Sequence, residues 1–277
     1  MPFKDLLVDI DSSKACAARL DAAIRLAQSH EAHLAGLYAK ANLSIPGFAE
    51  SQIPAEVLAA GRQRIKDHAA AAETMFRQAT EKAGVSAEWR CVSGDRVGVL
   101  ALHGRYADLI IVGQTDKDDP FSASMDLAGK LIFEVGGPVL VIPYIGTAER
   151  FGERVMVAWN ASREAVRAVH DALPVLECAK TVDVLSINPP GGATGDGEIP
   201  SADICLHLAR HGVSAEADHI EAHDIKVGDM LLSRAADKGV DLIVMGAYGH
   251  SRLRETVFGG ATRHLLEHMT VPVLMAH

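Results

Sequence analysis

Residues 241–262 read DLIVMGAYGHSRLRETVFGGAT, and this stretch decides how the chain is interpreted. It opens with successive apolar residues, which is typical of a parallel strand covered by helices on both faces. Glycines follow at 246, 249, 259 and 260, and a segment with helically spaced leucines comes next. A helix start offers unpaired N–H groups and a partial positive charge. The stretch therefore predicts a site that can hold a phosphate without a lysine.

The same kind of strand occurs earlier in the chain. Residues 108–113, DLIIVG, resemble residues 241–246, and PVLVI at 138–142 resembles PVLMA at 272–276. The segment LLVDIDSS at 6–13 also echoes RVMVAWNAS at 154–162, so the matching segments keep their order. Such self-similarity indicates a repeat. We expect two domains, residues 1–145 and 152–277, with the boundary near 144–152.

Each half alternates short apolar runs with longer segments of helical period, which is typical of βαβ units around a parallel sheet. Strands are predicted near 3–10, 33–38, 87–92, 108–112 and 138–142, and near 154–159, 181–187, 215–221, 241–245 and 272–276. Helices are predicted near 14–29, 55–83, 163–178, 201–211, 227–238 and 260–269. The fold class is thus α/β, with two tandem, doubly wound, parallel five-stranded sheets.

Details of the first helix and of two irregular stretches can also be predicted. Ser12 and Ser13 are good N-cap residues, and Ala17, Leu20, Ile24 and Ala27 would share one buried face of the helix over 14–29. Residues 41–54 and 188–200 interrupt the pattern after the second strand of each half. They are expected to be solvated connectors, with a lid over a site as the alternative.

Composition excludes several classes of protein. A formal net charge of -9 and an aromatic content of 5% disfavour nucleic-acid binding. No apolar stretch reaches membrane-spanning length and no signal peptide is recognisable, so a cytoplasmic protein is expected. The four cysteines are far apart and are interpreted as reduced core thiols. The Walker, GxGxxG, GxSxG and HExxH patterns are absent from the sequence.

Ligands of open α/β sheets bind beyond the carboxyl ends of the strands, where the strand order reverses. The strand ends at 158–160 and 186–188 would meet the glycine-rich stretch there. Asn160 is placed to hydrogen-bond a base or ribose, Thr262 could add a hydroxyl, and Arg252 could add a charge.

These residues resemble the universal stress proteins. Nucleotide-binding members of that family carry G-x2-G-x9-G-[S/T] between the fourth strand and the last helix, and Gly246, Gly249 and Gly259 have that spacing. Pro272-Val273-Leu274 is similar to the family's closing strand. The resemblance covers both halves, so the chain looks like a tandem universal stress protein. It implies an adenine nucleotide alpha hydrolase-like fold.

The resemblance also implies that the ligand is ATP or AMP, and Mg²⁺ is a further candidate. It implies a set of binding residues in the second half. These are Ala158, Trp159, Asn160, Ile187, Met245, Gly246, Gly249, Arg252, Gly259, Gly260, Ala261 and Thr262. The chain departs from the family pattern at Gly260, which replaces Ser or Thr, and at Asn160, which replaces aspartate. Both departures affect affinity and nucleotide preference more than the existence of the site.

The first half resembles a degenerate copy. Asp116 stands at the second glycine position, Asp118 and Asp119 add negative charge, and the last glycine position falls near Met125-Asp126. Carboxylates repel phosphate. Asp11, however, is retained at the family's aspartate position. We therefore expect the nucleotide site in the second half.

The resemblance implies a regulatory protein of the stress response. The residues favour nucleotide binding over catalysis, because no nucleophile with a base stands out. A slow ATPase or adenylyl-transferring enzyme that uses the same site is one alternative, and a nucleotide-free scaffold is another. Strands 138–142 and 271–276 should join the halves as an intramolecular pseudo-dimer. Further homodimerisation and protein partners stay open. The pairs His207/His211 and His264/His268 are interpreted as solvated helix faces, and no metal site is predicted.

Overall fold

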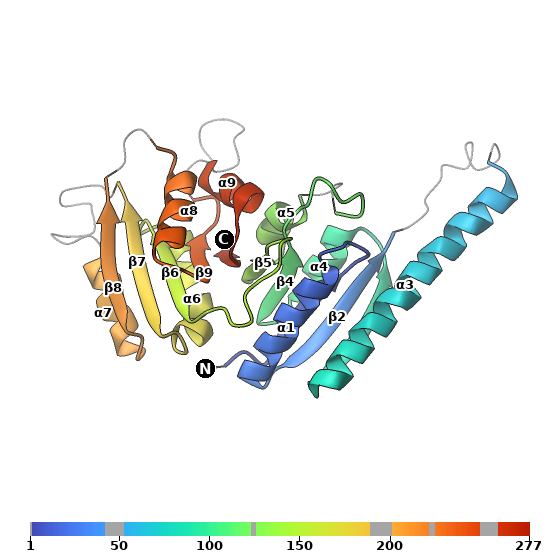
Figure 1. The fold of residues 1–277 in the computed structure, drawn as a ribbon, viewed down its shortest axis with the longest axis horizontal. Coiled ribbons are helices and arrows are strands. Elements are labelled where there is room, and N and C mark those ends of the chain that lie inside the picture. Colours follow the sequence, from blue (N-terminus) through green and yellow to red (C-terminus); the bar gives the residue numbers. More distant parts are fainter. Residues whose placement is uncertain (1, 42–52, 123–125, 189–200, 222–224, 250–259) are drawn as a thin grey trace.

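The computed structural model of the protein describes residues 2–41, 53–122, 126–188, 201–221, 225–249 and 260–277. Its described strands form one continuous sheet in the order β3-β2-β1-β4-β5-β10-β9-β6-β7-β8. The two halves of the chain lie side by side along this sheet, and the C-terminus lies near their junction (Figure 1).

The strands repeat one unit twice. In the first half they are β1 (Asp5–Ile10), β2 (His33–Lys40), β3 (Ala87–Ser93), β4 (Leu109–Gly113) and β5 (Val139–Ile142). In the second half they are β6 (Arg154–Trp159), β7 (Thr181–Ile187), β8 (Ala215–Ile220), β9 (Leu242–Gly246) and β10 (Val273–Ala276). Each of the predicted strands is confirmed to within two residues.

The helices of the first half are α1 (Cys16–His30), α3 (Ala55–Ala83), α4 (Arg96–Gly104) and α5 (Leu127–Glu134). Those of the second half are α6 (Arg163–Leu176), α7 (Ala202–Arg210), α8 (Val227–Asp237) and α9 (Gly260–His268). The sequence pattern does not predict α4 or α5. Their N-caps Asp95 and Asp126 each accept a backbone hydrogen bond.

The strand order reverses at one place in each half, between the first and fourth strands. β1 lies between β2 and β4, and β6 lies between β7 and β9, with parallel pairing throughout each half. Loops that leave these neighbouring strands diverge to opposite faces, which opens a crevice at the carboxyl edge. Each half therefore has one position where a ligand site is expected.

The halves meet through β5 and β10. These strands pair antiparallel, with Leu140 opposite Leu274, and this pairing confirms the expected edge-to-edge junction. Neither half thus leaves its fifth strand as an open edge, which is a known route to aggregation. Tyr248 of the second half also stacks on Phe133 of α5, with ring centroids 4.3 Å apart.

Helices cover both faces of the sheet. Buried residues of α1, α3, α6 and α7 form one apolar core with the sheet, and those of α4, α5, α8 and α9 form the other. This two-sided burial explains why β4 and β9 are apolar at successive positions. Phe76 of α3 packs directly over Gly36 of β2, where a side chain would lie 2.4 Å from the ring.

The start of α1 differs from the prediction. Its N-cap is Ala15, without a side-chain hydrogen bond, because the hydroxyl and amide of Ser13 both donate to Asp11 Oδ1. Ala17 is exposed, whereas Leu20, Ile24 and Ala27 are buried as expected. The buried face instead begins at Cys16.

The cysteines also differ from the prediction in part. All four are free thiols, but only Cys16 is buried, Cys205 is half-buried, and Cys91 and Cys178 are exposed. Burial raises the pKa of Cys16 to about 11 despite the nearby Arg19 guanidinium. Cys16 is therefore a protonated core thiol at neutral pH.

Candidate functional site

The carboxyl ends of β6, β7 and β9 open onto a cavity of about 290 Å³ in the second half. Parallel pairing brings Ala158 opposite Met245, and α9 begins at the rim with Gly260. This volume is at the lower end of the range for small-molecule sites. The cavity lies where the strand order reverses, as the fold class predicts.

Most of the binding residues expected from the sequence line this cavity. Its lining is Ala158, Trp159, Asn160, Leu185, Ile187, Val227, Leu231, Met245, Gly246, Tyr248, Gly249, Gly260, Ala261 and Thr262. Ten of the twelve expected residues are among them. The other two, Arg252 and Gly259, lie outside the described residues. The structure thus places the expected residues together, while their binding role stays a prediction.

Sequence reasoning missed four lining residues, namely Leu185, Val227, Leu231 and Tyr248. Val227 and Leu231 are one helical turn apart on α8, whose first residue lies at the carboxyl edge of the sheet. This i,i+4 apolar pair is the signal that could have found them. The missed residues add apolar and aromatic surface to the cavity lining.

The glycines serve packing more than backbone strain. A methyl group on Gly246 would lie 2.4 Å from the backbone nitrogen of Ala165, so this glycine lets β9 approach the start of α6. Neither Gly246 nor Gly249 has a positive φ. Among the described residues of this loop, Tyr248 has a positive φ, at 59°. A non-glycine residue held in this region is strained and occurs most often at functional sites.

Hydrogen bonds hold the polar side chains at the rim. Asn160 is exposed, and its side-chain oxygen accepts a hydrogen bond from the amide of Ser162 at 3.2 Å. The amide nitrogen of Asn160 can still donate to a ligand. Thr262 is buried, and its hydroxyl accepts from the amide of Tyr248 at 3.3 Å, which ties the loop to α9.

One carboxylate lies behind the loop. Glu164 is in the first turn of α6 and is 5% exposed, and a methyl group on Gly249 would lie 3.0 Å from its Oε2. Burial raises the pKa of Glu164, but hydrogen bonds from Arg163, its own amide and Ser162 outweigh burial and hold that pKa below its usual value. Glu164 is therefore ionised at neutral pH, close to the position proposed for phosphate.

Asp241 has a structural role at the start of the second half. Its carboxylate accepts hydrogen bonds from the amides of Gly152 at 2.7 Å and Arg154 at 3.1 Å. Asp108 does the same in the first half, with the amides of Lys4 and Asp5. The two aspartates fasten equivalent strands and take no part in the cavity.

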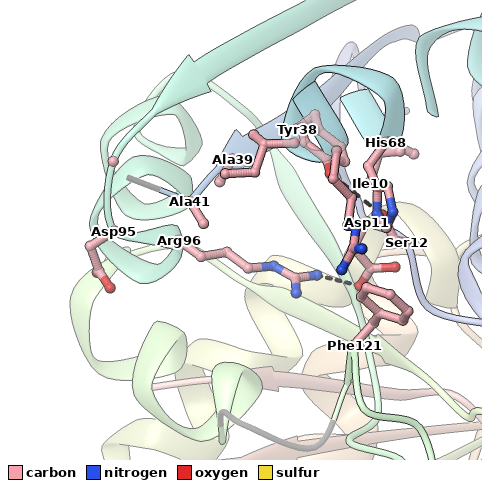
Figure 2. A pocket seen from close by; sticks show the side chains of 13 residues that line it. Ile10, Asp11, Ser12, Tyr38, Ala39, Ala41, His68, Asp95, Arg96 and Phe121 are labelled. Atoms are coloured by element: carbon pink, nitrogen blue, oxygen red, sulfur yellow. Dashed lines mark hydrogen bonds and ion pairs between the residues drawn. The ribbon is translucent and has the colours of Figure 1, made fainter. Parts of the chain in front are cut away.

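The corresponding place in the first half holds a buried ion cluster. Arg19 Nη2 lies 2.9 Å from Asp11 Oδ1, and the guanidinium of Arg96 hydrogen-bonds both Asp9 and Asp11. Figure 2 shows the contact between Arg96 and Asp11. Burial raises the pKa of Asp11, but Arg19 and Arg96 outweigh burial and hold that pKa well below its usual range. Asp9 and Arg19 are fully buried. Asp11 is thus retained, but it faces two guanidinium groups.

Carboxylates also occupy the positions where the first half would hold phosphate. The Asp126 side chain accepts a hydrogen bond from Gly129 at the start of α5, the helix equivalent to α9. Asp119 is buried and accepts from the amides of Lys14 at 2.7 Å and Phe121 at 2.9 Å. Asp116 accepts from the amide of Asp118. These contacts consume the donors that an anion would need.

The part of the chain that the structure describes contains no cluster of His, Cys, Asp or Glu able to hold a metal ion. His207 and His211 lie beside each other, and His264 Nε2 is 2.7 Å from Asp229.

None of the described helices has the length and the apolar character that crossing a membrane requires.

Fold and cavity together define an α/β protein of two joined, doubly wound halves with a small-molecule cavity at a strand-order switch point. The sequence model of the universal stress protein family matches residues 153–277. The second half of the chain, residues 153–277, thus carries a universal stress protein domain. Universal stress protein Slr1230 of Synechocystis is 33% identical over 67 residues, which are 24% of this chain and 22% of that protein's length.

Solved structures share the fold over the whole chain. The universal stress protein from Archaeoglobus fulgidus DSM 4304 superimposes with a TM-score of 0.74 at 15% identity and covers 98% of this chain and 97% of that one. A protein of Pseudomonas aeruginosa UCBPP-PA14 assigned to the universal stress proteins gives a TM-score of 0.58 at 16% identity, over 99% and 93% of the two chains. At these identities the likeness shows a common fold.

Proposed function

We propose that the chain binds an adenine nucleotide, ATP or AMP, in the second-half cavity and acts as a regulatory protein of the stress response. One observation carries the proposal. Ten residues expected to bind nucleotide, drawn from three strand ends and the start of α9, line one cavity. The halves, residues 1–145 and 152–277, would be two domains, of which only the second binds nucleotide.

The lining suggests how each part of the nucleotide would be held. Leu185, Ile187 and Val227 offer an apolar wall for the base. Asn160 is exposed at the end of β6, where it can reach the ribose. The phosphates would lie at the start of α9, where a methyl group on Gly260 would meet no described atom within 4 Å.

The charge balance supports AMP or ATP with Mg²⁺ more than free ATP. The described lining contains no cation, and Glu164 adds a nearby negative charge. Backbone amides alone favour a nucleotide that carries few negative charges, such as AMP. They also favour ATP whose phosphates bind Mg²⁺, because the ion offsets part of the charge. Arg252, which lies outside the described residues, is the further cation proposed to help.

A binding protein is favoured over an enzyme by the chemistry of the described lining. Its titratable side chain is Tyr248, and burial raises the pKa of Tyr248 to about 12. Tyr248 would not exchange protons near neutral pH. Occupancy would instead order the loop after β9 and change a surface read by partners.

Mass spectrometry of small molecules released from the purified, denatured protein tests the proposal. We expect AMP, ADP or ATP, and we expect added ATP to raise the melting temperature. A ligand at about 100 times its Kd stabilises the native state by roughly 2.7 kcal/mol. Absence of both released nucleotide and thermal stabilisation would favour the nucleotide-free scaffold.

Phosphate release separates the binding protein from the slow ATPase. The wild type and a Gly260→Asp variant are incubated with ATP and Mg²⁺, and inorganic phosphate is measured. We expect no release above the variant's background. Turnover that Gly260→Asp abolishes would support the enzyme.

A further inference from the structure

We propose that the first half holds a second small-molecule site, which takes a small organic monocarboxylate with an apolar body and not a nucleotide. A cavity of about 550 Å³ lies at the carboxyl ends of β1 and β2. Helix α3 and the start of α4 border it, with Ser12, Tyr38 and His68 on one side and Arg96 crossing it (Figure 2). This volume is ample for a ligand of that size.

The first-half cavity is not a copy of the second-half cavity. α3 has 29 residues and contributes Arg64, Ile65 and His68 to the wall. The equivalent helix α7 has nine residues and lines no part of the second-half cavity that the structure describes. The extra length of α3 thus builds a wall that has no counterpart among the described residues of the second half. A different ligand is expected where the wall differs.

The charged side chains at the floor of the cavity carry no net charge. Asp9 and Asp11 face Arg19 and Arg96, so two carboxylates balance two guanidinium groups. A phosphate monoester carries up to two negative charges, and burying a charge without a partner is costly. The floor therefore disfavours a nucleotide and tolerates an apolar ligand body.

The walls combine apolar surface with a short hydrogen-bond chain. Ser12 Oγ lies 3.4 Å from the Tyr38 hydroxyl and 3.1 Å from His68 Nδ1. The Phe121 ring is 51% exposed and lies 5.4 Å from the His68 ring. A flat apolar ligand would cover this exposed ring, and burial of aromatic surface is favourable.

Arg64 determines the charge of the ligand. It is exposed at the rim, and within the described ranges it has no carboxylate partner. The acid on the opposite rim, Asp95, is used as the cap of α4, where it accepts from Gly98 at 2.9 Å. One unpaired guanidinium matches one carboxylate, which it can bind through two parallel hydrogen bonds.

Calorimetry with trans-cinnamate tests the proposal, with the neutral amide cinnamamide as a matched ligand. We expect the intact chain to bind cinnamate once, and cinnamamide about tenfold more weakly. Arg64→Gln should weaken cinnamate binding by about tenfold or more. Arg77→Gln, on an exposed part of α3 outside the cavity, should leave it within about twofold.

Ala41→Trp gives an independent check, because Ala41 is an exposed residue at the rim and the indole would fill the mouth without disturbing the core. We expect this variant to keep its fold by circular dichroism and to lose cinnamate binding. Failure of the wild type to bind cinnamate at millimolar concentration, or equal binding by Arg64→Gln or Ala41→Trp, would overturn the proposal. So would AMP that displaces cinnamate in a Gly260→Asp background, since this result assigns the first-half cavity to nucleotide.

Discussion

The two halves place equivalent strand ends around equivalent switch points, but the side chains there are charged in the first half and mostly uncharged in the second. Asp9 in β1 corresponds to Ala158 in β6, and Arg96 at the start of α4 corresponds to Val227 at the start of α8. The first half has a buried ion cluster beside its cavity, and the second half has a largely uncharged cavity. A shared fold thus sets where a site can be, and side chains set the charge of its lining.

The glycine that ends the fourth strand shows the same divergence. A methyl group on Gly113 would lie 2.3 Å from Arg19 Nη1, and one on Gly246 would lie 2.4 Å from the Ala165 backbone. The first half uses the space for a buried cation, whereas the second uses it to bring a helix start close to the sheet. A conserved position in the repeat therefore has two different physical roles.

The largest expected effect comes from removing the buried cation. Arg19→Met leaves Asp9 and Asp11 with Arg96 alone, and breaking a buried pair typically costs about 3–5 kcal/mol. Urea unfolding followed by Trp89 fluorescence, in a Trp159→Phe background, reports on the first half. Arg77→Met, which breaks an exposed ion pair with Glu73, is the control and should lower the free energy of unfolding by less than about 1 kcal/mol. Equal costs would mean that the ion cluster is not what stabilises this half.

The next effect concerns the start of α9. Gly260→Asp gives the second half a carboxylate near the position that Asp126 occupies in the first, and we expect nucleotide affinity to fall about 100-fold or more, or roughly 2.7 kcal/mol. Gly260→Ala, which adds a methyl group that meets no described atom within 4 Å, should change affinity by no more than about threefold. Thermal stability without ligand should be nearly unchanged in both. Nucleotide binding by Gly260→Asp at wild-type affinity would contradict the comparison.

Acid should affect the ion cluster in a defined direction. The pKa of Asp11 is lowered in the folded state, so its contribution to stability is present above the unfolded pKa of about 3.9 and is lost as the pH falls below it. The free energy of unfolding of the first half should therefore decline from about pH 4 downward. In Asp11→Asn this decline should be shallower, as measured by urea unfolding at several pH values. An unchanged slope would show that Asp11 does not carry the effect.

Glu164 should give the smallest effect. Its ionised carboxylate lies beside the loop, so Glu164→Gln should strengthen nucleotide binding by about three- to tenfold at low salt. Glu177→Gln, on an exposed residue after α6, is the control and should have no effect. Weaker binding by Glu164→Gln would mean that the carboxylate orders the loop instead of repelling phosphate.

Much of the fold could be predicted because apolar runs and repeated segments are local signals. The strand ends at Trp159 and Ile187 followed from strand boundaries alone. The start of α1 could not be predicted, because Asp11 competes for the Ser13 hydroxyl and only the folded chain brings Arg96 to Asp11. The wall made by α3 was also missed, since the direction of a long helix relative to the sheet is a tertiary property.

Isothermal titration of the intact chain with AMP and with ATP and Mg²⁺ tests the central claim most directly, because it counts nucleotide sites. The account predicts one site per chain, which Gly260→Asp abolishes and Arg64→Gln leaves intact. Two sites per chain, or a single site that survives Gly260→Asp, would contradict it.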